Sequence, residues 1–216
     1  MNDPKIDINL ILKKLRSKRK VFHSEADFQF ELAWNIKEIY NERANIRLEY
    51  CTINESGINQ YIDIVVIMDH KHFIPIELKY KTKSSENTIV DNNEMYNLKS
   101  QGAQDLGKFD YLHDIERVES FKSLYGFSEG YCILLTNDAS YTKIRDNNTR
   151  NKEFNIGHNQ IKHGTLRWRS DSSIYTKKHR KESIILDGSY EMKWDTYYDF
   201  NNGKNSKFFI LVTTIY

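Results

Sequence analysis

The sequence predicts a single α/β domain in which helices flank a mixed central sheet. Helical periodicity appears before residue 42 and again after residue 94, and apolar β-branched runs lie between and after these segments. A chain of 216 residues is long enough for one full hydrophobic core. Only two prolines and nine glycines interrupt it, so most of the chain should form regular elements.

Two helices are expected before the first strand. Residues 6–20 place apolar side chains on one face and end in a basic run, which suits the helix macrodipole and a bound phosphate about equally. The second helix, about residues 24–42, has clearer start signals. Ser24 and Asp27 have the spacing of a capping box, and Phe22 and Phe28 that of a hydrophobic staple.

Three strands are expected next. Residues 46–53 alternate weakly, whereas residues 61–68 are β-branched, aromatic or apolar apart from Asp63. A polar turn at residues 69–72 leads to a third strand at residues 73–81, and so short a connection predicts an antiparallel hairpin.

The rest of the core should be one helix and one strand. After a polar loop at residues 82–93, residues 94–121 predict a helix with irregularity near Gly102 and Gly107. Residues 131–136 predict a buried central strand, and residues 208–216 hold a final strand. The core would thus span about residues 22–136 of a single domain, 1–216. The pattern resolves no elements in the basic polar elaboration at residues 137–207.

Cysteine usage and the N-terminus bound the cellular setting. Cys51 and Cys132 lie in separate segments without a C-x-x-C pattern, so we expect two reduced, partly buried thiols and no zinc site. The N-terminus lacks the apolar core of a signal peptide, and no run approaches ~18 apolar residues. We therefore expect a cytoplasmic protein that has no membrane contact.

The residues that carry chemistry lie on the central hairpin. Glu77 and Lys79 share one face of the third strand because side chains alternate along a strand. Asp63 falls opposite Glu77 or Lys79 if the turn holds three residues, and on the wrong face if it holds two. The grouping therefore requires an odd-length turn or a bulge.

Two carboxylates and an ammonium suit phosphodiester hydrolysis. Asp63 and Glu77 offer hard oxygen ligands to Mg²⁺, for which Mn²⁺ should substitute, and the Leu78 carbonyl offers another. Lys79 is placed to orient or deprotonate the attacking water and to stabilise charge on the phosphate. A surface salt-bridge ladder is the competing explanation, but such pairs contribute only ~0–1 kcal/mol and these strands are too apolar for exposed edges.

The arrangement Asp63 … Glu77-Leu78-Lys79 resembles the motif of the PD-(D/E)XK nuclease superfamily, which includes restriction endonucleases, repair nucleases and Holliday junction resolvases. The expected element order over the core, αβββαβ, is similar to that of the superfamily. Ile62 stands where the name-giving proline would be. The resemblance implies a restriction-endonuclease-like fold and metal-dependent cleavage of phosphodiester bonds, with DNA as the expected substrate.

The resemblance also implies helper residues on the core helices. Glu25 falls near the middle of the apolar face of its helix, whereas Glu31 falls well off it, so Glu25 is the candidate catalytic and metal-binding acid. A glutamate favoured by the helix dipole is an equal alternative. Gln101 and Gln104 are candidates for a glutamine that approaches the site, against the alternative that both are simply solvated.

Positive charge is concentrated after residue 137, although the net charge of the chain is only +2. Such a concentration suits contact with a nucleic-acid backbone, and Trp168 could stack on a base, but a solvated loop is the alternative. The candidate nucleic-acid-binding residues of this region are Arg167, Trp168, Arg169, Lys177, Lys178, Arg180 and Lys181.

The sequence therefore predicts a metal-dependent deoxyribonuclease. Three alternatives remain open: a catalytically silent nucleic-acid-binding module of a larger complex, an RNase or toxin of the same fold, and a small-molecule-binding protein unrelated to nucleases. Cutting both strands of a duplex commonly uses two copies of such a site, which makes a homodimer an expected assembly.

Overall fold

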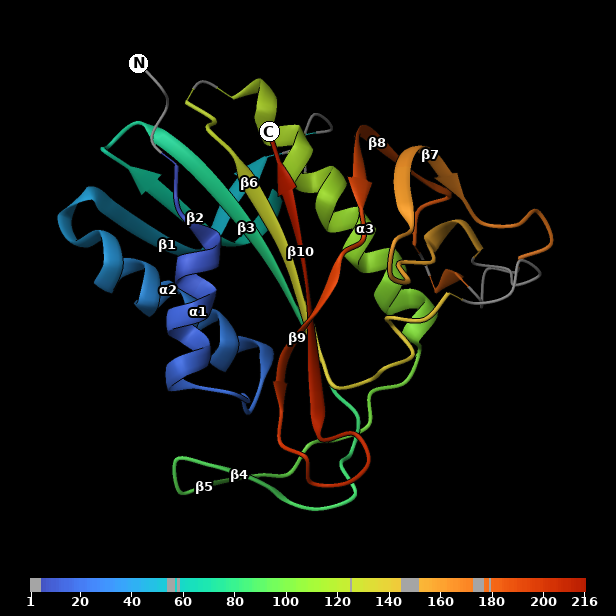
Figure 1. Ribbon diagram of the computed structural model, residues 1–216. Coiled ribbons are helices and arrows are strands. Elements are labelled where there is room, and N and C mark those ends of the chain that lie inside the picture. Colours follow the sequence, from blue (N-terminus) through green and yellow to red (C-terminus); the bar gives the residue numbers. More distant parts are fainter. Residues whose placement is uncertain are drawn as a thin grey trace.

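A six-stranded mixed sheet forms the centre of the protein, with strand order β1-β2-β3-β6-β10-β9. The computed structural model describes residues 5–53, 57, 59–124, 126–144, 152–172, 177–178 and 180–216. Helices α1 (Ile8–Lys18) and α2 (Glu25–Tyr40) cover one face of the sheet, and α3 (Gln104–Ser120) covers the other (Figure 1). The predicted class, a mixed sheet flanked by helices, is confirmed.

One parallel pair makes the sheet mixed. β3 runs parallel to β6, and the other neighbours in the sheet are antiparallel. Up to β6, the main helices and strands that follow α1 have the predicted order α-β-β-β-α-β. The sheet strands are β1 (Ala44–Ile53), β2 (Asn59–Met68), β3 (His72–Lys81), β6 (Gly130–Thr136), β9 (Trp194–Asp199) and β10 (Lys207–Ile215).

The start of α2 confirms both predicted signals. The Ser24 hydroxyl accepts a hydrogen bond from the backbone N–H of Asp27 at 3.1 Å, and the rings of Phe22 and Phe28 lie 4.9 Å apart. The Asp27 carboxylate accepts from the backbone N–H of His23 at 2.8 Å, one residue earlier than in a standard capping box. The first turn of α2 is therefore fixed by side chains from both sides.

We expect Ser24→Ala to lower the free energy of unfolding by about 1 kcal/mol, because the amide of Asp27 would lose its cap. Urea denaturation followed by circular dichroism measures this loss. Ser24→Asp should retain most of the stability, and Ser17→Ala, an exposed serine near the end of α1, serves as the matched control. Equal stabilities of the two alanine variants would show that the cap contributes nothing.

The prediction of a helix from residue 94 is wrong in its first third. Residues Glu94–Tyr96 form strand β5, which pairs with β4 (Ile89–Asp91). Between the two strands, Asn92 and Asn93 both have positive φ, 49° and 66°, which is the conformation of a tight hairpin turn. This paired-asparagine signal overrides the helical pattern, and α3 begins only after Ala103.

The elaboration after residue 137 contains three strands that the sequence pattern did not resolve. β7 (Ile161–Arg167) pairs with β8 (Ser183–Glu191), and these strands pack with α3 in a second hydrophobic core. β9 joins the edge of the main sheet beside β10. Of the two free cysteines, Cys132 is buried but Cys51 is exposed, contrary to the expectation of partial burial. None of the helices in the described ranges has the length and apolarity needed to span a membrane.

Candidate active site

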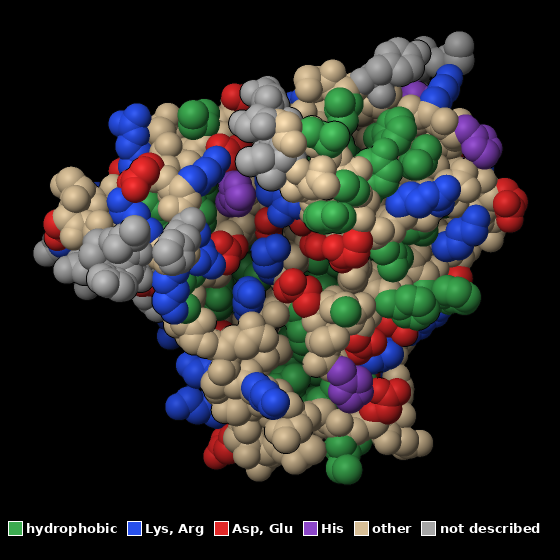
Figure 2. All heavy atoms as spheres, turned by 180° about the vertical axis from the view of Figure 1, so that it is seen from behind, with side chains coloured by type: hydrophobic (Ala, Val, Ile, Leu, Met, Phe, Trp, Pro, Cys, Tyr) green, Lys and Arg blue, Asp and Glu red, His purple; other side chains and the backbone are tan. Residues whose placement is uncertain are grey.

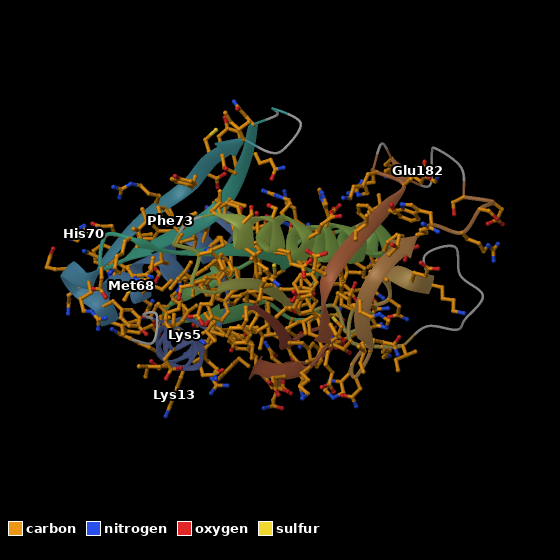
Figure 3. The ribbon with its side chains drawn as sticks, turned by 90° about the horizontal axis from the view of Figure 1, so that it is seen from above. Lys5, Lys13, Met68, His70, Phe73 and Glu182 are labelled. Atoms are coloured by element: carbon orange, nitrogen blue, oxygen red, sulfur yellow. The ribbon has the colours of Figure 1, made fainter. Side chains whose placement is uncertain are left out.

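The hairpin of β2 and β3 has the odd-length turn that the site requires. Met68 pairs with His72, so the turn holds three residues, 69–71. The last pair of the ladder is Ile64 with Ile76, and the same register places Asp63 across from Glu77. His70 marks the turn, at the opposite end of the molecule from Glu182 (Figure 3).

The sheet forks beyond that last pair. β2 remains paired with β1 back to residue 59, while β3 remains paired with β6 up to residue 81. The paired ends of β1 and β2 beyond the fork therefore depart from the rest of the sheet (Figure 3). Carboxylates occupy two backbone donors of β3 at the fork: Asp63 Oδ2 accepts from the N–H of Leu78, and Glu25 Oε2 from that of Tyr80, both at 2.6 Å.

A second side chain of α2, Gln29, also holds the strands in place at the fork. Gln29 is buried, and its Nε2 donates to the backbone carbonyl of Asp63 at 2.6 Å and to Glu49 Oε1 at 2.8 Å. One helix thus supplies Glu25 to β3 and Gln29 to β2. The half-buried Glu25 points inward, as its place on the apolar face predicted.

Glu77 and Lys79 meet side chains of α3. Glu77 Oε1 lies 2.8 Å from Arg117 Nη2, and Lys79 Nζ lies 2.7 Å from Asp114 Oδ2. Arg117 Nη1 lies 3.4 Å from Asp114 Oδ1, which joins the two pairs into one network. Glu77 and Asp114 are only 1% and 3% exposed. Arg117 also donates to the carbonyl of Tyr61, so it connects β2 to β3 across the fork.

The two close contacts of this network are ion pairs at hydrogen-bonding distance. Oε1 of Glu77 and Oδ2 of Asp114 are buried, and apart from these two cations neither atom has a hydrogen-bond partner among the residues that the structure describes. Buried carboxylate oxygens usually have such partners, so these two atoms retain lone pairs for a further donor or cation.

Burial governs the protonation of the network. Desolvation, reinforced by the charges of Asp114 and Asp63, raises the pKa of Glu77 well above its usual value. Desolvation also raises the pKa of Asp114 to about 6, against the opposing charges of Lys79 and Arg117. Burial acts to lower the pKa of Lys79, but Asp114, Glu77 and Glu25 outweigh it and the pKa is raised. In this state Lys79 is an ammonium, which suits charge stabilisation better than proton abstraction.

Two carboxylates and one carbonyl could hold a divalent cation here. Within the described ranges, no three His, Cys, Asp or Glu side chains are grouped closely enough to hold a metal ion. Mg²⁺ does not require three, because it keeps several waters and commonly takes one or two carboxylates with substrate phosphates. Asp63, Glu77 and the carbonyl of Leu78, which accepts from Lys79 Nζ at 3.2 Å, match that donor set. Counting Glu25 and Asp114, four carboxylates face two cations, so the ionised site has two excess negative charges.

Sequence reasoning missed Asp114 and Arg117. Both lie on the side of α3 that faces the sheet, among buried apolar residues such as Tyr111, Ile115 and Val118. Charged residues three positions apart within an apolar helical face were the available signal, since such residues are costly to bury without partners.

The candidate glutamines form hydrogen bonds away from the central pair of acids. Gln101 is exposed and its Nε2 lies 3.4 Å from the hydroxyl of Thr82, while Gln104 Nε2 donates to Asp138 Oδ2 at 3.0 Å. Gln101 precedes α3 rather than lying on it, and Gln104 is the first residue of that helix. The predicted role of either glutamine at the site stays a prediction.

The proposal that Trp168 stacks on a base is wrong. Its side chain is 6% exposed and packs between Phe109 and Phe154, with ring centroids 5.2 and 4.7 Å away. The indole N–H donates to the carbonyl of Lys181 at 3.2 Å. Trp168 therefore belongs to the core between α3 and the β7–β8 pair.

Several basic candidates are ion-paired. Arg180 contacts both carboxylate oxygens of Asp110 on α3, at 2.7 and 2.6 Å, and Lys181 contacts Glu116 on the same helix. Close acidic partners also neutralise two others: Lys177 with Glu182 at 2.5 Å, and Arg169 with Asp171 at 2.6 Å. Arg167 and Lys178 are exposed, and His179 of the same tract lies outside the described residues. Contact of this tract with nucleic acid stays a prediction, and the compensating acids weaken it.

Acidic and basic side chains gather together near the middle of the face seen from behind (Figure 2). This mixture is consistent with a site built from opposed charges rather than with a uniformly basic surface. No family model, curated protein or solved structure matches the chain.

Proposed function

We propose that the chain is a Mg²⁺-dependent nuclease of the PD-(D/E)XK type that hydrolyses phosphodiester bonds, with DNA as its substrate. The observation that carries the proposal is that Asp63 falls across from Glu77 where β2 and β3 separate, close enough that the charges of Asp63 and Lys79 both shift the pKa of Glu77. The order of elements around this fork, with β6 parallel to β3, supports a restriction-endonuclease-like core.

Each residue has a distinct task in this proposal. Asp63, Glu77 and the carbonyl of Leu78 would hold the cation, which when bound supplies Lewis acidity and a more acidic water. Lys79 stabilises negative charge on the phosphate and orients the water, and its ammonium is held in place by Asp114 at 2.7 Å. Glu25 assists by fixing the backbone of β3 next to the site.

The test is cleavage of supercoiled plasmid, linear duplex, single-stranded DNA and RNA with Mg²⁺ or Mn²⁺. We expect metal-dependent cutting of DNA, reduced at least about 100-fold by Lys79→Ala because a positioned charge-stabilising group is lost. Lys71→Ala, an exposed lysine in the turn at the far end of the hairpin, should cleave like the wild type.

Comparing the four substrates distinguishes the proposed deoxyribonuclease from the alternative functions. Cutting of RNA alone would replace DNA by RNA and favour an RNase or toxin. If the folded wild type binds nucleic acid but shows no metal-dependent cutting, the catalytically silent binding module is favoured. The ion pair of Glu77 with Arg117 supports that alternative, because it gives the carboxylate a partner other than a metal ion. We propose a cytoplasmic location for the protein. We also propose that two copies act together to cleave a duplex, and sedimentation in the presence of DNA would check for this homodimer.

A further inference from the structure

A groove borders the candidate site on the α3 side. It has a volume of about 690 Å³ and runs between the departing end of the β1–β2 hairpin, the C-terminal half of α3, and β8. Its polar lining comes from all three sides and includes Thr52, Gln60, His113, Arg117, Ser120 and Lys181. Figure 3 shows the hairpin and β8 rising on either side of α3.

Arg117 joins this groove to the candidate site. Its side chain lines the groove, and its Nη2 lies 2.8 Å from the buried Glu77 Oε1. The side chain is 21% exposed and lines the groove although its guanidinium contacts the acid. A phosphate held at Glu77 would therefore lie beside a positive charge, and the N–H groups of Arg117 that do not contact Glu77, Tyr61 or Asp114 could donate to it.

The acids of the groove are largely engaged already. Glu116 contacts Lys181 and the backbone N–H of Ile185. Glu119 is buried, and its carboxylate accepts hydrogen bonds from the N–H groups of residues 187 and 188 and from the hydroxyl of Tyr190. Lys181 compensates the charge of Glu116, and Lys122, whose Nζ lies 3.8 Å from Glu119 Oε1, compensates that of Glu119, which lowers their repulsion of a phosphate backbone.

We propose that this groove is the path of the substrate strand and that Arg117 binds a substrate phosphate at its inner end. The proposal rests on the proposed nuclease function and adds the residue and the surface that receive the strand. Arg117 contacts the substrate in this scheme, whereas Asp114, which holds Lys79, is a positioning residue.

The first experiment measures binding of a fluorescent oligonucleotide over a range of salt concentrations, in a Lys79→Ala background that prevents cutting. Arg117→Met should weaken binding and lower the slope of log K against log salt by about 0.7–0.9, the effect of losing one phosphate contact. Arg117→Lys keeps the charge and should keep the slope, but should bind more weakly because an ammonium has fewer N–H donors than the guanidinium that contacts Glu77, Tyr61 and the phosphate together. Arg43→Met, which removes an arginine paired with Asp69 near the far end of the hairpin, is the matched control.

The second experiment does not depend on the folding of an Arg117 variant. The exposed Cys51 is first removed by Cys51→Ser. A photocrosslinker is then attached through Ser120→Cys in the groove or, for comparison, through Ser17→Cys at an exposed position on α1. We expect crosslinks to DNA from position 120 and none from position 17. Cys132 is buried and should not be labelled.

The outcomes separate the groove from the proposed function. A wild type that cleaves DNA while position 120 gives no crosslink, or while Arg117→Met leaves the salt slope unchanged, overturns the groove and keeps the nuclease. A wild type that neither cleaves nor binds nucleic acid overturns the proposed function, and the groove assignment with it.

Discussion

Replacing Glu77 with glutamine is expected to lower metal-dependent cleavage by about 10³-fold while leaving the chain folded. A neutral amide of the same shape fits the site but is a poor ligand for Mg²⁺. Losing about 4 kcal/mol of charge stabilisation corresponds to three powers of ten in rate. The measurements are kcat/KM on a labelled oligonucleotide and the affinity for Mn²⁺ by calorimetry.

Glu38→Gln is the matched control for this substitution. Glu38 is on α2 and pairs with the surface lysines Lys14 and Lys18, so its loss should change neither cleavage nor metal affinity. A Glu77→Gln protein that cleaves within tenfold of the wild-type rate would show that Glu77 is not a metal ligand. The site would then be a structural charge network.

The second large effect is on stability and concerns Lys79 and Asp114. Asp114→Asn should lower the free energy of unfolding by about 3 kcal/mol, because it leaves the mostly buried ammonium of Lys79 without its carboxylate. Lys79→Met in the same protein should recover part of that loss, since the orphaned charge is then gone. The expected coupling in a double-mutant cycle by urea denaturation is about 1–3 kcal/mol.

The exposed pair of Arg43 and Asp69, 3.0 Å apart, supplies the control cycle. Its coupling should stay at or below about 1 kcal/mol, because solvent and salt screen surface ion pairs. Equal coupling in the two cycles would mean that burial adds nothing to the Lys79–Asp114 interaction.

Predictions based on local sequence succeeded where the chain is locally determined. The two-residue period of the strands placed Glu77 and Lys79 on one face and required an odd-length turn or a bulge to bring Asp63 to that face, and the turn holds three residues. The cap at Ser24 was predictable for the same reason, since it involves only neighbouring residues.

The contributions of α3 were not predictable in this way. Which of its charged residues reach Glu77 and Lys79 depends on how the helix lies across the sheet. The prediction that Trp168 stacks on a base failed for a related reason. The side chain is buried because it packs against Phe109 and Phe154, which are distant in sequence. A basic composition around it suggested an exposed surface, but tertiary contacts decided otherwise.

The fork between β2 and β3 has a consequence for how mutations at this site should be interpreted. Asp63 and Glu25 replace the hydrogen-bond acceptors that a continuous neighbouring strand would have offered to Leu78 and Tyr80. Removing either side chain therefore leaves an amide of the sheet without its acceptor, in addition to any loss of a ligand. Inactivity of an alanine variant at these two positions mixes damage to the framework with damage to the chemistry. Only shape-preserving amide substitutions, with stability measured alongside, separate the two.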